Sequence, residues 1–272
     1  MANPILNEKA TAEAAKAGWG APDPSSRSTP IPGTPITDGP VSPWSSGPRM
    51  TIKGTATATG VLLVLLLITA SIGWSVTGST LDSTAKFPML ALVGVLVGFG
   101  CAIALRFKPK MAPVLAPIYA LAQGFFLGVI SKFYNDRYDG IVVQAVGATL
   151  AVFAVMLVLY KSRIIKVTER FRRIVIMATM GLMLFYLVSI VISLFGGTVP
   201  FIDSASPMGI LFSVFAAGLA AMMLAVDFDL VERGVAQGWP KGMEWYCAFG
   251  LLATLVWLYL ELLRLLSKLQ RN

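Results

Sequence analysis

Runs of about twenty apolar residues recur along the chain, and their length constrains the fold more than any other feature. An α-helix rises about 1.5 Å per residue, so roughly twenty residues cross the hydrocarbon core of a bilayer. Of the 272 residues, 56% are hydrophobic and 13% are charged, which is more apolar surface than a soluble core could bury. The sequence therefore predicts an all-α membrane protein, a bundle of about seven transmembrane helices at residues 56–77, 87–106, 112–132, 140–160, 172–196, 207–229 and 242–267.

The first fifty residues have a different composition. They hold nine of the chain's sixteen prolines, with many serines, threonines and glycines. Such a segment cannot bury enough apolar surface to offset the entropy lost on ordering. No apolar stretch precedes a small-residue cleavage site, so we expect no signal peptide. We predict a disordered Pro/Ser/Gly-rich tail at residues 1–50 and a transmembrane domain at residues 51–272.

Lysine and arginine gather on one side of the predicted membrane. If each run crosses once, the tail and the second, fourth and sixth loops hold sixteen of the 22 basic residues. Basic loops stay in the cytoplasm, so the N-terminus is expected there. The basic C-terminus disagrees with this orientation: either it protrudes outward, or the last segment does not cross fully. The basic residues on the opposite side are Lys86, Lys132, Arg137, Arg264, Lys268 and Arg271.

The chain lacks the residues and motifs on which most enzymes depend. Histidine is absent, which removes the usual proton shuttle and neutral zinc ligand. The sequence contains no Walker loop, no Gly-x-Gly-x-x-Gly and no Gly-x-Gly-Asp element of an intramembrane protease. We therefore predict no enzymatic activity and no cofactor. The net charge of +8 lies in tails and loops, which is typical of membrane orientation and not of nucleic-acid binding.

Small residues recur at a spacing of four inside the predicted helices. The pairs are Gly94 with Gly98, Gly124 with Gly128, and Ala217 with Ala221. Residues four apart share one helix face, and small side chains let neighbouring backbones approach closely in lipid. We expect these faces to pack against other helices.

Four acidic residues lie within or at the ends of predicted helices, where burying a charge costs about 2.5–3.5 kcal/mol at mid-bilayer. Asp227 and Asp229 end the sixth run, Glu244 opens the seventh, and Glu261 lies deep within the seventh. Asp227 and Asp229 are two residues apart, about 200° around a helix, so only one can face the bundle interior.

Arg106 closes the second run on the same predicted side as Asp227, which permits an ion pair between them. Two simpler interpretations compete. Asp227, Asp229 and Arg106 could merely mark where helices leave the membrane, and Glu261 could pair locally with Arg264 three residues on.

Two segments of the chain have a distinctive pattern. Residues 116–124 read APIYALAQG, and Asp227 is followed by Asp229 at +2 and Val231 at +4. These segments resemble the Bax inhibitor family, in its bacterial YccA-like branch: the first is similar to the family's third-helix Tyr-x-x-x-Glu-Gly pattern, and the second fits the spacing at the end of its sixth helix. Tyr259-Leu260-Glu261 resembles the Tyr-Leu-Asp of its seventh, and residues 244–268 look like an actinobacterial-type subgroup.

The chain departs from this pattern at the candidate site. Gln123 replaces the family's third-helix Glu, which puts an ionic role there in doubt. The separation between Asp227 and Glu261 is about ten residues longer than the family's. Aligning the C-terminal ends instead places Thr254 at the acid position, and counting depth along the helix favours Glu244 as the neighbour of Asp227.

The resemblance implies a bundle with the last helix central, in the inner (plasma) membrane of a bacterium, acting as a pH-sensitive leak for calcium ions. Asp227 and Glu261 would then share a proton, because two facing carboxylates in a low dielectric cannot both ionise easily. Arg106, paired with the ionised acid, would hold the cytoplasmic end closed. Carboxylates also suit calcium, although the sequence specifies no metal site. The alternative is a non-transporting regulator that binds other membrane proteins, such as a membrane-bound protease.

Overall fold

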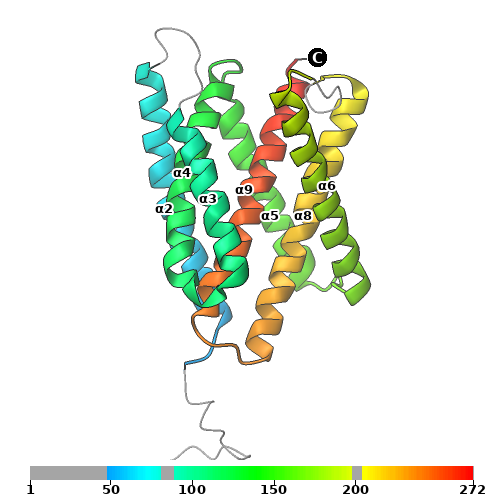
Figure 1. Cartoon of the computed structure of the whole chain (residues 1–272). Helices are drawn as coiled ribbons and strands as arrows, with labels where there is room; N and C mark the ends of the chain where they lie inside the picture. The colour runs from blue at the N-terminus through cyan, green and yellow to red at the C-terminus, as the bar shows by residue number, and fades with distance from the viewer. Residues whose placement is uncertain (1–47, 81–88, 198–203, 272) are drawn as a thin grey trace, which may run out of the picture. The chain divides into compact units, whose positions relative to one another are not determined.

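The computed structural model describes residues 48–80, 89–197 and 204–271, and within them it confirms the predicted seven-helix bundle (Figure 1). Of the predicted disordered tail at residues 1–50, residues 1–47 lie outside this part of the chain. The α-helices are α2 (Ile52–Thr80), α3 (Met89–Phe107), α4 (Ala112–Asn135), α5 (Ile141–Lys161), α6 (Glu169–Leu194), α8 (Pro207–Ala236) and α9 (Met243–Leu269), with the 3₁₀ turn η2 (Pro109–Met111) before α4.

The helices have the length and composition of membrane spans. Six described segments are long and apolar enough to cross a bilayer, and the apolar part of α3, Val93–Phe107, is shorter. Large apolar side chains such as Leu150, Leu187 and Leu211 are about 60% exposed on the outside of the bundle. A soluble protein would bury such side chains, whereas lipid solvates them. The chain is therefore a multi-pass membrane protein, as the apolar runs predict.

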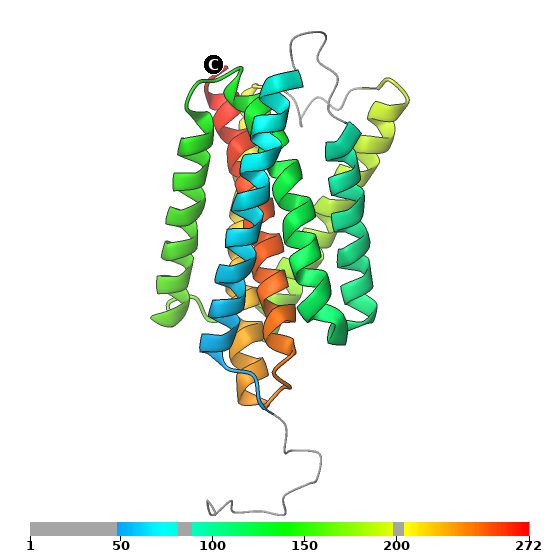
Figure 2. The same ribbon diagram turned by 90° about the vertical axis from the view of Figure 1, so that its left-hand side faces the viewer.

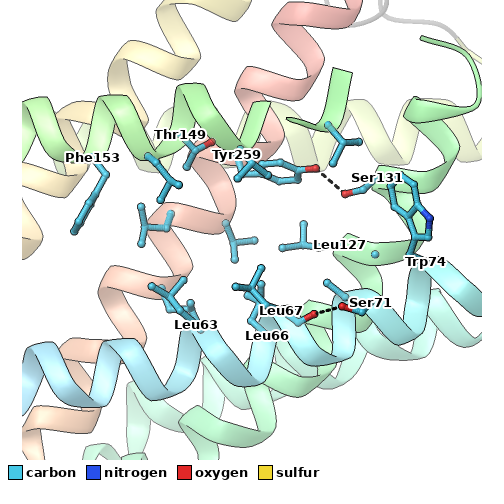
Figure 3. Close-up of a pocket in the computed structure, with 18 residues that line it drawn as sticks. Leu63, Leu66, Leu67, Ser71, Trp74, Leu127, Ser131, Thr149, Phe153 and Tyr259 are labelled. Carbon is cyan, nitrogen blue, oxygen red and sulfur yellow. Dashed lines mark hydrogen bonds between the residues drawn. The ribbon is translucent and has the colours of Figure 1, made fainter. Parts of the chain in front are cut away.

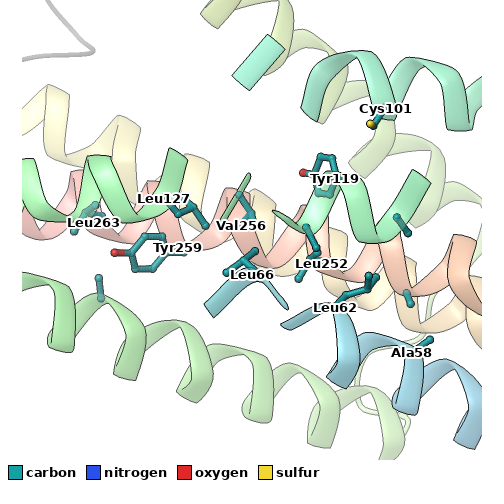
Figure 4. Close-up of a cluster of buried hydrophobic side chains, with 14 of the residues drawn as sticks. Ala58, Leu62, Leu66, Cys101, Tyr119, Leu127, Leu252, Val256, Tyr259 and Leu263 are labelled. Carbon is teal, nitrogen blue, oxygen red and sulfur yellow. The ribbon is translucent and has the colours of Figure 1, made fainter. Parts of the chain in front are cut away.

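Helix α9 occupies the centre of the bundle, as expected (Figures 1 and 2). It contacts α2, α4, α5 and α8. Leu252, Val256 and Tyr259 of α9 pack with Leu62 and Leu66 of α2 in one buried cluster (Figure 4). Helix α9 runs the length of the bundle, so the basic C-terminal residues lie at the end opposite to the start of α2 (Figure 1).

Helices α2 and α4 pack closely together, and small residues allow it. A methyl group built at Gly124 would collide with the backbone of Leu66, and one at Gly128 would collide with the backbone of Ala70. Gly94 similarly faces the Ala122 carbonyl, and Gly98 faces the side chain of Gln123. Glycine at residues 94, 124 and 128 therefore lets the backbones approach without a side chain between them.

Helix α8 continues seven residues beyond its predicted end at residue 229. The prediction ended the helix where acidic and basic residues begin, but partners hold these residues in helical conformation. Arg233 Nε lies 2.6 Å from Asp229 Oδ2, and Arg163 Nη2 lies 2.5 Å from Glu232 Oε1. Tyr160 of α5 also donates a hydrogen bond to Glu232. These contacts tie the end of α8 to the segment that follows α5.

The first described residues pair with the loop between α8 and α9. Met50 N donates to the Trp239 carbonyl at 2.7 Å, and Lys241 N donates to the Pro48 carbonyl at 2.9 Å. The buried Glu244 carboxylate accepts hydrogen bonds from Thr51 N at 2.9 Å and Thr51 Oγ1 at 3.0 Å. A carboxylate at a helix N-terminus offsets its unpaired N–H groups, so α9 caps α2.

Candidate functional site

Asp227 is a buried carboxylate in the interface between α8 and α9. Its residue surface is 7% exposed, and Oδ2 accepts a hydrogen bond of 2.5 Å from Thr254 Oγ1. Helix α8 runs nine residues beyond Asp227, about 13 Å, so the helix does not end at this aspartate.

Helical periodicity places both partners in the interior. Leu224 and Val231, at −3 and +4 from Asp227, are buried with it on one face of α8. Leu251 and Leu258 stand in the same relation to Thr254 on α9 and are also buried. The Asp227–Thr254 hydrogen bond is therefore surrounded by apolar side chains, where a charged carboxylate is costly unless hydrogen-bonded.

Asp229 points elsewhere, as its position about 200° further around the helix requires. Its carboxylate is 13% exposed and pairs with Arg233 one turn on. Arg233 also pairs with Glu169 at the start of α6. Asp229 thus belongs to the ion pairs at the end of α8, while Asp227 belongs to the interior.

Glu261 lies in a second buried cluster, between α6 and α9. Its residue surface is 2% exposed, and its carboxylate accepts hydrogen bonds from Tyr186 Oη at 2.8 Å and Trp257 Nε1 at 3.1 Å. Arg264 Nη1 lies 3.2 Å from Glu261 Oε2 and donates to Tyr186 Oη at 3.0 Å. Glu261 and Arg264 thus form the local ion pair that the sequence permits, and Tyr186 and Trp257 donate further hydrogen bonds to Glu261.

The structure does not bring the predicted dyad together. Asp227 is bound by Thr254, which precedes Glu261 by seven residues, or about 10 Å along α9. The residue opposite Asp227 on α9 is therefore Thr254, whose hydroxyl is neutral. Thr254 is the alternative that alignment of the C-terminal ends indicated. Glu244, the alternative favoured by depth, lies ten residues before Thr254 and binds Thr51 instead.

Arg106 does not form an ion pair with Asp227 or Glu261 in this structure. It lies in the last turn of α3 and is exposed. Among the described side chains, no carboxylate lies within ion-pair distance of its guanidinium. The described part of the chain also contains no group of three or more Asp, Glu, Cys or His side chains suited to a metal ion.

Sequence reasoning did not connect Tyr186 or Trp257 with Glu261, although both donate hydrogen bonds to its carboxylate. Tyr186 lies inside a long apolar run and belongs to none of the sequence motifs described above. Trp257 precedes Glu261 by four residues, a spacing at which side chains meet on a helix, and that signal was available.

A large cavity of about 570 Å³ lies between α2, α4, α5 and α9 (Figure 3). Leucine, valine and aromatic side chains form most of its wall. Its polar groups include Thr149 and the Ser131–Tyr259 pair, whose hydroxyl oxygens are 2.6 Å apart. None of its lining residues is a carboxylate, so these walls offer no charged ligand to a cation.

Comparison with known proteins identifies the family. No curated protein and no solved structure matches the chain. The sequence model of the family described as Bax inhibitor 1 like matches residues 3–271, nearly the whole chain. This agrees with the resemblance of the third, sixth and seventh helices. The chain is a multi-pass membrane protein that belongs to the Bax inhibitor 1 like family.

Proposed function

We propose that the protein is a pH-sensitive cation leak, with calcium as the ion to test first, and that Asp227 is its proton-binding group. The observation that carries the proposal is the buried Asp227 carboxylate, hydrogen-bonded to Thr254 across the α8–α9 interface. Ionisable residues inside membrane spans are costly, so they commonly serve proton or ion movement.

The proposed mechanism follows from the charge of Asp227. The ionised carboxylate attracts the Thr254 hydroxyl strongly, because a hydrogen bond to a charged acceptor is about twice as strong as a neutral one. Protonation weakens that bond, so α8 and α9 can separate. The leak should therefore increase as the pH falls. The proposal makes Asp227 the proton-binding group by itself and not as part of a dyad with Glu261. Glu261 instead binds Tyr186 of α6, to which its neighbour Arg264 also donates a hydrogen bond.

We predict that Asp227→Asn raises calcium flux at neutral pH several-fold and removes its pH dependence, because an amide resembles the protonated acid. The measurement is calcium entry into liposomes containing the purified full chain, at neutral and mildly acidic pH. Thr254→Val, which removes the hydroxyl donor at similar volume, should also raise flux at neutral pH. The variant that carries both substitutions should show little more calcium flux than either single variant.

Asp229→Asn is the matched control. It removes the same charge only two residues away, but the Asp229 side chain faces Arg233 and not the α8–α9 interface. It should keep the wild-type pH profile. Equal effects at Asp227 and Asp229 would contradict the proposal. No flux at any pH, combined with recovery of a stoichiometric protein partner, would favour the non-transporting regulator.

We also propose that the protein lies in a bacterial inner membrane with a cytoplasmic N-terminus. The support is the basic-residue distribution, since the start of α2 and the loop between α5 and α6 lie at the same end of the bundle (Figure 1). A cysteine at Ser45, in a chain whose two native cysteines are buried, should resist impermeant thiol reagents in intact cells and react after permeabilisation. Labelling in intact cells would reverse the orientation.

A further inference from the structure

The large cavity between α2, α4, α5 and α9 lies apart from the Asp227–Thr254 contact and opens to the outside of the bundle (Figure 3). Helices α2 and α5 both pack against α9, but they hardly contact each other. Leu67 of α2 and Leu150 of α5 line the cavity and are exposed. The α9 wall, which includes Leu252 and Val256, is buried. The cavity is therefore continuous with the surface that lipid solvates.

The cavity follows the helices over the depth of one leaflet. Its lining residues extend from Leu63 to Trp74 on α2 and from Val142 to Phe153 on α5. Each pair is eleven residues apart in the sequence, which is roughly 16 Å along a helix. The hydrocarbon core is about 30 Å thick, so the acyl chains of one leaflet occupy about 15 Å of it. The cavity thus has the length of one acyl chain.

The two ends of the cavity differ in chemistry. Trp74 and Ser131 lie at one end, and Leu63 and Phe153 lie at the other (Figure 3). The ammonium of Lys132, in the last turn of α4, lies 5.6 Å from the centre of the Trp74 ring. Tryptophan and lysine near the end of a span favour the headgroup region. Leu63 is near the middle of α2, so the cavity extends from the headgroup level toward the middle of the membrane.

Hydrocarbon suits this cavity better than water. Its hydroxyl groups already have partners within the protein. Ser131 pairs with Tyr259, and Thr149 and Ser71 each donate to a carbonyl one turn back on their own helix. A buried water needs about two to four polar partners, and apolar cavities without them stay dry. An empty cavity would leave its wall atoms without dispersion contacts, which an adjacent lipid chain can supply.

We infer that this cavity binds one acyl chain of a bilayer phospholipid, which enters between α2 and α5 from the leaflet beside Trp74. The ester end of the chain lies near Trp74, and its methyl end lies between Leu63 and Phe153. The volume of about 570 Å³ lies within the usual range for ligand sites. The chain then packs against α9 where no helix of the protein does. The inference stands on this cavity and does not depend on ion flux.

The test is photo-crosslinking from within the lipid. The purified full chain is placed in vesicles of phosphatidylethanolamine and phosphatidylglycerol, with a phosphatidylethanolamine probe that carries a diazirine at the end of one acyl chain. After irradiation, mass spectrometry locates the label. Bulk lipid should label exposed residues such as Leu187 and Leu211, whereas only a chain inside the cavity can label the buried Leu252 and Val256. Labelled outer residues without label on α9 would overturn the inference.

Two matched variants test whether the cavity itself is responsible. Val142→Phe combined with Val146→Phe adds two rings on the face of α5 that lines the cavity. This variant should lose most of the α9 label and keep the outer label. Val143→Phe combined with Val155→Phe makes the same changes at exposed positions of α5 outside the cavity, and should keep both labels. Equal loss of the α9 label in both variants would contradict the inference.

Two further probes test the direction and the source of the chain. A diazirine next to the ester should move the label from Leu63 and Phe153 to Trp74 and Val142. The reverse order would place the chain in the other leaflet and overturn the assigned direction. A free fatty acid with the same diazirine, at the same chain concentration, should label α9 no more strongly than the phospholipid does. Stronger labelling would overturn the assignment to a phospholipid and make the occupant a free fatty acid.

Discussion

Replacing Arg264 with methionine should lower the free energy of unfolding by about 3 kcal/mol, the lower end of the range for breaking a buried ion pair. The substitution leaves the Glu261 carboxylate, which is 2% exposed, with only the neutral donors Tyr186 and Trp257 among the partners described above. The lower end applies because the Arg264 side chain itself is 29% exposed. The measurement is chemical unfolding in mixed micelles, followed by the near-ultraviolet circular dichroism of the tryptophans.

The companion variant Glu261→Gln should cost less, because the partly exposed Arg264 side chain can turn its guanidinium toward water. Combining both substitutions should recover most of the stability lost in Arg264→Met, since no buried charge then remains unpaired. If the double variant is less stable than Arg264→Met, the two residues do not form an energetically coupled pair.

Gly128→Leu should have an even larger effect on folding. Any side chain at this position collides with the backbone of Ala70, and a helix backbone cannot move aside without separating α2 from α4. Overpacking typically costs about 1–3 kcal/mol and occasionally more, and a collision with backbone belongs at the upper end of that range. We expect most of this variant to aggregate on extraction, as judged by size-exclusion chromatography, with a lowered unfolding midpoint in what remains.

Gly147→Leu is the control for this substitution. It makes the same change at an exposed position of α5, where nothing lies within 4 Å of a built Cβ. Its unfolding midpoint should stay at or above that of the wild type, because leucine favours helix over glycine. A similar loss in both variants would show that added bulk, and not the α2–α4 contact, causes the effect.

The sequence predicted the helices well because lipid leaves few alternatives. An apolar run of about twenty residues must satisfy its backbone hydrogen bonds internally, so its existence and type follow from composition. The error at the end of α8 has the opposite cause. The predicted helix ended at Asp229, which left Glu232 and Arg233 in the following loop. Contacts of these two residues with Tyr160, Arg163 and Glu169 accompany the longer helix. Such partners come from distant parts of the chain, so a local sequence pattern does not reveal them.

The candidate site was predictable in part. Periodicity showed that only one of Asp227 and Asp229 could face inward, and the burial of both partners identifies Asp227. The residue opposite it depends on the axial offset between α8 and α9, which the loop at residues 237–242 sets. No periodicity fixes that offset, so Glu244, Thr254 and Glu261 remained open, and motif similarity favoured a residue two turns too far along α9.

The central position of α9 has a consequence for biosynthesis. The ribosome makes this helix after α2, α4, α5 and α8, yet all four pack against it. Until α9 enters the membrane, these four helices lack the partner that separates them from lipid, and Thr51 lacks the Glu244 carboxylate made 193 residues later. Chain termination before residue 243 should therefore leave an inserted but loosely associated set of helices, whose unpartnered faces favour misassembly.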